Sequence, residues 1–268
     1  MKTIPESEGR SAFGINAVGY DNSRPEYPEW FFDTLVQQQV LYPGAVTLEI
    51  GPGNGLATRK IVELGASPVT LVEPDNRFAP LLRSITDHDG EPCQIIHQPF
   101  EEAELPASSF DLVVVATAFH WLDPITRVEK LAWLTKTGGA VVLLWNVFQD
   151  INLADPFHEA TKSMFEQLPK SPSENSAGLP FALDRCTREA EFISTGDFEL
   201  LLHAEGHWKL KLDPRGVRSL YEGYSNISRL PITEREDLLN RIEVVAKSEF
   251  AGQIERNMTS PLYVFRRV

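Results

Sequence analysis

Short apolar segments alternate with amphipathic segments between residues 46 and 145. The amphipathic segments between them, such as 56–64 and 75–85, carry apolar residues at helical spacing. Buried strands alternating with helices are typical of a parallel sheet with crossover helices. The pattern therefore predicts an α/β fold with a doubly wound, mostly parallel sheet. The five predicted strands cover residues 46–50, 68–73, 93–97, 110–116 and 140–145.

Different patterns flank this unit. A helix is predicted from Pro28 to just before Pro43, and Asp123 with Pro124 predicts the start of another. Beyond Trp145 a helix should follow Asp155, and then comes a Ser-, Pro- and Gly-rich loop. The remainder should form a long strand at 198–212, a helix after Asp213, a helix introduced by the Thr233–Glu236 capping box, and a closing strand at 261–268.

Composition narrows the class of protein. The 268 residues carry 25 Lys and Arg against 38 Asp and Glu, a formal net charge of −13. An acidic surface disfavours nucleic-acid partners and favours a small molecule. With only Cys93 and Cys186 there is no disulfide framework, and the histidines lack metal-ligand spacing, so we expect no metal. The polar N-terminus and the short apolar runs predict a cytoplasmic protein without membrane contact.

The sharpest motif is EIGPGNG at 49–55, where the first strand hands over to a helix. Gly51, Gly53 and Gly55 permit close approach of a ligand to backbone amides at a helix N-terminus. A dinucleotide fingerprint requires its third glycine one position later, where this chain has Leu56. Glu49 would repel a pyrophosphate but attract an ammonium group. These features favour the methionine end of S-adenosylmethionine over a nicotinamide cofactor; a turn without ligand is the alternative.

Acidic and aromatic residues follow the next two strands. Glu73 lies about 20 residues past the glycine loop, where a carboxylate accepts hydrogen bonds from a ribose diol, although it could be an exposed strand-end acid. Phe100 could lie on an adenine ring, with Glu101 or its backbone meeting the exocyclic amine. Phe100 could equally be a core residue.

Taken in order, EIGPGNG, LVEPD, FEEAELPASSFDLVVVATAFHWLD and TGGAVVLLWN resemble the motifs of class I S-adenosylmethionine-dependent methyltransferases, particularly the trans-aconitate-type group that acts on small molecules. YDNSRPEYP at 20–28 resembles that group's entry segment. The resemblance implies a Rossmann-like sheet of seven strands with the last antiparallel. It also implies a cofactor-binding core at 1–146 with an N-terminal cap helix, a lid insertion at 147–195, and completion of the sheet at 196–268.

The same resemblance implies roles for individual residues. Two departures stand out: Pro99 replaces an acidic residue common in relatives, and Pro52 removes a donor from the loop. Tyr20 and Arg24 could close over the cofactor carboxylate, or Arg24 could be a surface charge. The remaining implied cofactor contacts are Glu49, Gly51 and Gly53 at the methionine portion, Glu73 with Pro74 at the ribose, Phe100 and Glu101 at the adenine, and Ala116, Thr117 and Phe119 at the methyl-donor side.

Methyl transfer is an in-line displacement at an activated carbon, so alignment and exclusion of water matter more than a base. His120 is the nearest candidate base if the acceptor must lose a proton, and otherwise it packs beside Trp121. We therefore predict a methyltransferase acting on a small acceptor. A non-catalytic adenosyl-binding regulator and a nicotinamide-dependent oxidoreductase are the alternatives, and the protein could be a monomer or a homodimer.

Overall fold

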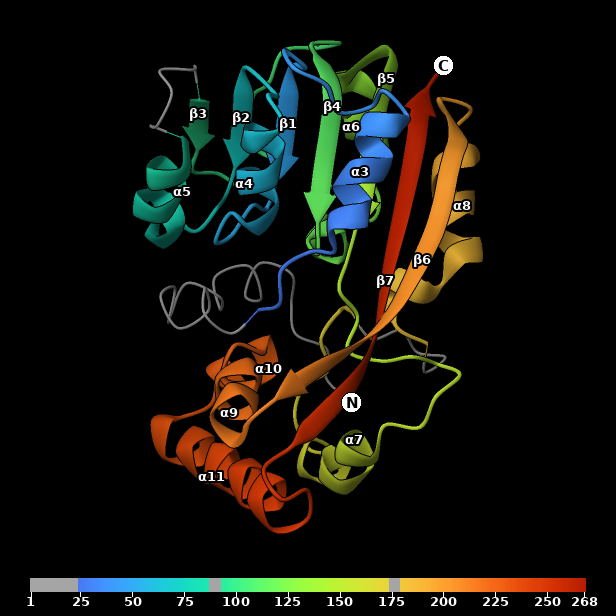
Figure 1. Cartoon of the computed structure of the whole chain (residues 1–268). Helices are drawn as coiled ribbons and strands as arrows, with labels where there is room; N and C mark the ends of the chain where they lie inside the picture. The colour runs from blue at the N-terminus through green and yellow to red at the C-terminus, as the bar shows by residue number, and fades with distance from the viewer. Residues whose placement is uncertain (1–23, 87–92, 174–178) are drawn as a thin grey trace. The chain divides into compact units, whose positions relative to one another are not determined.

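The computed structural model describes residues 24–86, 93–173 and 179–268. Seven strands form one sheet in the order β3-β2-β1-β4-β5-β7-β6 (Figure 1). Strands β1 to β5 are parallel to one another, and β7 is antiparallel to β5. This confirms the predicted doubly wound sheet and its antiparallel last strand. The strands are β1 (Thr47–Ile50), β2 (Val69–Val72), β3 (Cys93–Ile96), β4 (Phe110–Ala116), β5 (Thr135–Leu144), β6 (Phe198–Leu212) and β7 (Ile254–Arg267).

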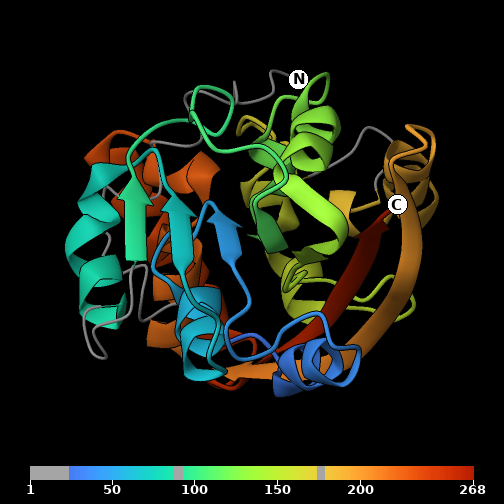
Figure 2. The ribbon, with the colours of Figure 1, turned by 90° about the horizontal axis from the view of Figure 1, so that it is seen from above.

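Helices cover both faces of the parallel strands. Figure 2 shows α3 and α6 on opposite sides of the sheet. Helix α6 begins at Arg127 rather than at Pro124, because Asp123 caps a turn by accepting from the amide of Ile125 and the hydroxyl of Thr126. The helices of this region are α3 (Glu29–Gln37), α4 (Leu56–Glu63), α5 (Ala79–Thr86), α6 (Arg127–Leu134) and α8 (Arg185–Ile193), with short 3-10 turns η2 (Asn76–Phe78), η3 (Phe119–Trp121) and η5 (Phe181–Leu183).

The chain divides into two compact units. The larger contains 26–145, 181–205 and 260–268, and the smaller contains the described parts of 1–25 and 146–180 together with 206–259. The predicted lid segment 147–195 is thus shared between the two units, and its closure over a site stays a prediction. Strands β6 and β7 each contribute residues to both units.

The two units are built around different cores. In the larger, the central strands β4 and β5 are buried on both faces, as expected of a covered parallel sheet. In the smaller, α9 packs against α11 around buried Phe157, Val217 and Leu239. Helix α11 starts after Pro231, so Thr233 lies inside it and forms no capping box. The smaller unit's helices are α7 (Pro156–Thr161), α9 (Pro214–Glu222), α10 (Ser225–Ser228) and α11 (Ile232–Ser248), with the 3-10 turn η4 (Lys162–Met164).

Candidate functional site

The candidate site lies at the carboxyl edge of the parallel strands in the larger unit. Glu49 lies near the end of β1, Glu73 follows β2, Thr117 follows β4 and Trp145 follows β5. In the sheet order β1 stands between β2 and β4, so these residues end neighbouring strands. Open α/β sheets bind ligands in the crevice at this edge, where the strand order reverses.

The three glycines of the loop after β1 all have a left-handed backbone. Gly51, Gly53 and Gly55 have φ angles of +67°, +54° and +78°. A Cβ on Gly51 would lie 2.7 Å from the Cβ of Ala118, whereas a Cβ on Gly53 would meet nothing within 4 Å. Gly51 therefore serves contact within the protein, and Gly53 is the position whose missing side chain leaves room beside the loop.

The amides of this loop are already donated within the chain. Gly51 N–H donates to Val72 O at 2.9 Å, and Gly55 N–H donates to Pro52 O at 2.8 Å. Gly53 N–H donates to the Glu73 carboxylate at 3.0 Å. The sequence suggested that bare amides would receive a ligand, but these three donors all have partners in the structure. The chemistry open to a ligand therefore resides more in nearby side chains than in these amides.

Glu49 is the most unusual side chain of the site. It is fully buried, and its Oε2 accepts from the hydroxyl of Thr58 at 2.6 Å. Its Oε1 has no hydrogen-bond partner in the part of the chain that the structure describes. Burial, with a smaller contribution from the charge of Glu73, raises the pKa of Glu49 to about 7 against the Thr58 hydrogen bond, which lowers it. A buried carboxylate with an open oxygen suits a cationic donor.

Glu73 ties the glycine loop to the end of β2. Its two carboxylate oxygens accept from the amides of Gly53, at 3.0 Å, and Asp75, at 2.9 Å. Burial raises the pKa of Glu73 to about 7, although both backbone hydrogen bonds lower it. The side chain is thus not the exposed strand-end acid that the sequence left open. The adjacent Pro74 is half-buried.

Phe100 and Glu101 are held by protein contacts. Phe100 is 2% exposed, and the Lys130 ammonium lies 5.0 Å from its ring centroid. Lys130 Nζ also donates to the Phe100 carbonyl at 2.7 Å. Glu101 Oε1 accepts from the Asp123 amide at 2.8 Å. These contacts favour the core alternative for Phe100, and contact of either residue with adenine stays a prediction.

The end of β4 carries a backbone outlier. Thr117 has a φ of +53°, which a β-branched residue rarely adopts, and its amide donates to Leu144 O at 2.8 Å. Its hydroxyl lies 2.7 Å from the Tyr27 hydroxyl. Ala116 and Phe119, on either side, are buried. Such strain is found preferentially at functional sites, which agrees with the role that the resemblance implies for this turn.

His120 is buried within aromatic surroundings. Trp145 Nε1 donates to His120 Nδ1 at 3.4 Å, and the centroid of the imidazole lies 5.2 Å from that of the Trp121 ring. An Nδ1 that accepts a hydrogen bond assigns the proton of the neutral ring to Nε2. This arrangement fits the packing alternative, because a general base needs a nitrogen that can accept the acceptor's proton. A catalytic role for His120 stays a prediction.

The two residues of the entry segment are not placed at this site. Tyr20 lies outside the described residues. Arg24 belongs to the smaller unit, where its Nη2 donates to Gly223 O at 3.2 Å and its guanidinium lies 5.5 Å from the Tyr224 ring centroid. A contact of either residue with the cofactor stays a prediction.

The sequence did not identify three contributing residues. Thr58 was expected only to belong to a crossover helix, yet its hydroxyl binds Glu49. Tyr27, which contacts Thr117, precedes the predicted first helix. Arg188 lies on α8, a helix that was not predicted within the lid segment. Asp184 caps this helix by accepting from the amide and hydroxyl of Thr187, a start signal that could have located it.

The residues that the structure describes lack two kinds of feature. They contain no cluster of three or more His, Cys, Asp or Glu side chains that could hold a metal ion. Among the described helices, none combines the length and the apolar character that crossing a bilayer requires.

Comparison with known proteins agrees with this geometry. Residues 48–143, from β1 to the end of β5, match the model of a methyltransferase domain family. This part of the chain is similar to a methyltransferase domain. This confirms the resemblance drawn from the ordered motifs, since the matched segment includes the glycine loop, both acids and the turn after β4.

Two curated relatives show how far the likeness extends. An uncharacterized methyltransferase of Mycobacterium tuberculosis is 31% identical over 137 residues, covering 50% of this chain and 52% of the relative. The chain thus aligns with about half the length of that methyltransferase. An uncharacterized methyltransferase of Schizosaccharomyces pombe is 21% identical over 261 residues, covering 96% of this chain and 97% of the relative.

Two solved structures share the fold. The phosphoethanolamine N-methyltransferase 2 of Haemonchus contortus, solved with phosphomonomethylethanolamine and S-adenosylhomocysteine, has a TM-score of 0.54 at 14% identity and covers 95% of this chain and 57% of that one. The [4+2]-cyclase SpnF has a TM-score of 0.60 at 12% identity and covers 100% of this chain and 97% of that one. At such identities the likeness concerns the fold alone. One of these two fold neighbours is named as a cyclase.

Proposed function

We propose that the protein transfers the methyl group of S-adenosylmethionine to a small-molecule acceptor. The observation that carries the proposal is Glu49: a fully buried carboxylate at the end of β1, beside the glycine loop, with one oxygen lacking a partner among the described residues. An isolated buried charge is costly, so such an oxygen is expected to meet a cation when a ligand binds. The ammonium of the methionine moiety supplies one.

The neighbouring groups fit the rest of the same cofactor. Glu73 is a carboxylate at the end of β2 that can accept from ribose hydroxyls, a contact made in place of, or beside, its bonds to Gly53 and Asp75. Gly53 leaves open space where a side chain would stand. A nicotinamide dinucleotide fits less well, because its pyrophosphate would approach two carboxylates.

The bound cofactor supplies a sulfonium-activated methyl group. The protein's own residues would hold the donor through Glu49 and Glu73, exclude water with the buried turn around Thr117 and Phe119, and align the acceptor. An acceptor that is already a nucleophile in its anionic form requires no base.

Calorimetry with S-adenosylhomocysteine and NAD tests the cofactor assignment. The wild-type protein should bind S-adenosylhomocysteine and not NAD. Glu49→Gln, which keeps the shape but loses the charge, should weaken S-adenosylhomocysteine binding by about a hundredfold, the equivalent of about 3 kcal/mol for a hydrogen bond between charged groups. Glu73→Gln should weaken it by about tenfold or more for the same reason.

Glu63→Gln is the matched control, because Glu63 is an exposed acid on α4 whose ion pair with Lys60 lies at the surface. The affinity of Glu63→Gln for S-adenosylhomocysteine should equal that of the wild type. Tight NAD binding, or unchanged S-adenosylhomocysteine affinity in folded Glu49→Gln, would contradict the proposal. Release of S-adenosylhomocysteine from S-adenosylmethionine with a panel of small acceptors then separates an enzyme from a non-catalytic adenosyl-binding regulator.

A further inference from the structure

Arg188 on α8 is a buried cation with open donors. Its side chain is 6% exposed, and neither Nε nor Nη1 has a hydrogen-bond partner in the part of the chain described. Its guanidinium carbon lies 3.6 Å from the ring centroid of Phe181. Burial, followed by repulsion from Arg127, lowers the pKa of Arg188 against the attraction of Glu191 and Asp184, but a guanidinium remains charged at neutral pH.

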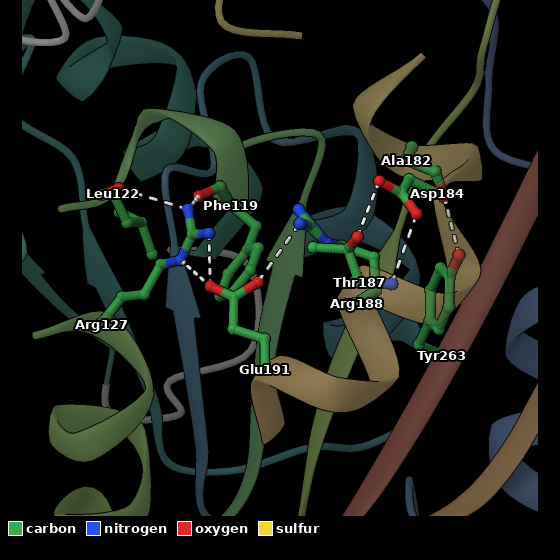
Figure 3. A network of polar contacts seen from close by, with 9 residues as sticks. All are labelled: Phe119, Leu122, Arg127, Ala182, Asp184, Thr187, Arg188, Glu191 and Tyr263. Atoms are coloured by element: carbon green, nitrogen blue, oxygen red, sulfur yellow. Dashed lines mark hydrogen bonds and ion pairs between the residues drawn. The ribbon is translucent and has the colours of Figure 1, made fainter. Parts of the chain in front are cut away.

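Arg188 shares its ion-paired carboxylate with a second buried arginine. Arg127, also buried, donates from Nε to Glu191 Oε1 at 2.5 Å and from Nη1 to Phe119 O at 3.0 Å. Glu191 Oε2 lies 3.4 Å from Arg188 Nη2. Figure 3 shows the Glu191 carboxylate between the two guanidinium groups. Two cations therefore share one carboxylate.

The other acids of α8 are engaged elsewhere. Asp184 accepts from the amide and the hydroxyl of Thr187, as Figure 3 shows, and Glu189 pairs with Arg185. Asp184 therefore acts on Arg188 only by its charge, and Arg188 shares the carboxylate with which it is ion-paired, that of Glu191, with Arg127. Leaving donors of a buried cation unsatisfied is unfavourable, and an anionic ligand removes that cost. The two guanidinium nitrogens without partners suit the oxygens of an anion such as a carboxylate.

Aromatic rings surround Phe181, on which Arg188 stacks. The Phe181 centroid lies 6.2 Å from that of Phe119, 5.8 Å from that of His120 and 6.3 Å from that of Trp145. Phe119 and His120 belong to the turn after β4, and Trp145 follows β5. The cationic cluster therefore adjoins the strand ends at which the methyl group is expected, beside a largely buried group of aromatic rings of the kind that packs against a flat molecule.

We propose that Arg188 binds the carboxylate of a small, flat, monoanionic acceptor, whose apolar body packs against the rings of Phe181 and Trp145. Arg127 and Glu191 act as positioning residues that hold the Arg188 guanidinium against the Phe181 ring. The inference rests on the proposed methyl transfer only in that the bound molecule is the methyl acceptor. The anion site itself rests on the geometry of the cluster.

Benzoate and benzamide are the probes, because they have the same shape and differ in charge. Binding of each is measured by calorimetry at constant ionic strength, with and without saturating S-adenosylhomocysteine. The wild type should bind benzoate at least about tenfold more tightly than benzamide, as expected for a charge-assisted hydrogen bond. Arg188→Gln should bind benzoate at least about tenfold more weakly than the wild type, and no more tightly than benzamide.

Arg185→Gln is the matched control, because Arg185 is an exposed cation on the same helix. It should bind benzoate as the wild type does. Arg188→Gln should also fold, since it removes a buried charge with two unsatisfied nitrogens, and a variant that unfolds would make Arg188 structural and overturn the proposal. Equal affinity of the wild type for benzoate and benzamide, or wild-type benzoate affinity in Arg188→Gln, would overturn it as well.

The failure of the proposed function has a different signature. If S-adenosylhomocysteine does not bind but benzoate discrimination depends on Arg188, the methyl-transfer proposal is wrong and the anion site stands. If S-adenosylhomocysteine binds and benzoate discrimination is absent, the cofactor assignment stands and the carboxylate site is wrong.

Discussion

Two buried arginines differ in how their charge is satisfied. In the smaller unit, Arg256 donates to Asp155 Oδ2 at 2.6 Å, to the Tyr221 hydroxyl at 2.8 Å and to Phe148 O at 3.0 Å. In the larger unit, Arg188 keeps two nitrogens without partners among the described residues. The two side chains are almost equally buried, at 3% and 6% exposure. Burial of charge alone therefore does not distinguish the two arginines, whereas the unsatisfied nitrogens of Arg188 do.

The buried acids show the same contrast. Asp155 uses Oδ2 for Arg256 and Oδ1 for the amide of His158 at the start of α7. Glu49 has only the Thr58 hydroxyl on one oxygen, with the other oxygen open in the described structure. Asp155 is thus expected to stabilise its unit, and Glu49 to weaken its own until a ligand binds. Each half of this contrast can be tested by removing charge while keeping shape.

The largest effect is expected in the satisfied pair. Asp155→Asn keeps an acceptor for the His158 amide but leaves Arg256 as a buried cation without a counter-charge. The free energy of unfolding should fall by about 3–5 kcal/mol, the cost of breaking a buried ion pair. Urea unfolding measures it, with Glu255→Gln at the exposed pair with Lys209 as a control that should change by about 1 kcal/mol or less. If Asp155→Asn lost as little unfolding free energy as the control, the buried ion pair would not stabilise its unit, and the contrast with Glu49 would disappear.

The second effect has the opposite sign. Because the pKa of Glu49 is raised to about 7 in the folded protein, its folded state holds the proton more tightly than the unfolded state does. Stability from this group is present at acid pH and is lost as the pH rises through about 7. Glu49→Gln should therefore raise the free energy of unfolding of the ligand-free protein by up to about 3 kcal/mol at pH 8, and by much less at pH 5.

Urea unfolding of the wild type and Glu49→Gln at the two pH values checks this sign. Glu63→Gln, at an exposed position, should show no such pH-dependent gain. Destabilisation of Glu49→Gln at pH 8 would mean that the buried carboxylate is satisfied in the folded protein, and the distinction between Glu49 and Asp155 would disappear.

The contrast also explains what the sequence could predict. The spacing of apolar residues and the turn signals locate the ends of β1, β2 and β4 to within a residue or two, because strands buried on both faces are continuous apolar runs. Glu49, Glu73 and the three glycines follow from their places at strand ends. That Gly51 is required by Ala118, and that the loop amides are already donated, depends on contacts between segments far apart in sequence.

Helix α8 shows why the rest was missed. Its segment follows a Ser-, Pro- and Gly-rich loop, and its buried side chains, Arg188 and Phe192, include a charged residue that an apolar pattern does not count. Arg188 and Glu191 lie one turn apart on α8, and the carboxylate is shared only because Arg127 of α6 also binds it. The places of the candidate cofactor residues at strand ends were therefore predictable, whereas the proposed acceptor side required tertiary structure.

The smallest effect separates two roles for Glu101. Its Oε1 accepts from the Asp123 amide at 2.8 Å, so by the same reasoning it is a satisfied acid that supports the turn before α6. Glu101→Ala should lower the free energy of unfolding by about 1–2 kcal/mol, the cost of leaving that donor without its charged acceptor. Calorimetry should show S-adenosylhomocysteine affinity changed by no more than about threefold, since the backbone near an adenine would be preserved.

Glu102→Ala, at the next residue, is the control for local helix and loop propensity. A tenfold loss of affinity with unchanged stability would instead assign the Glu101 side chain to the adenine, and satisfaction within the protein would no longer distinguish structural acids from binding ones.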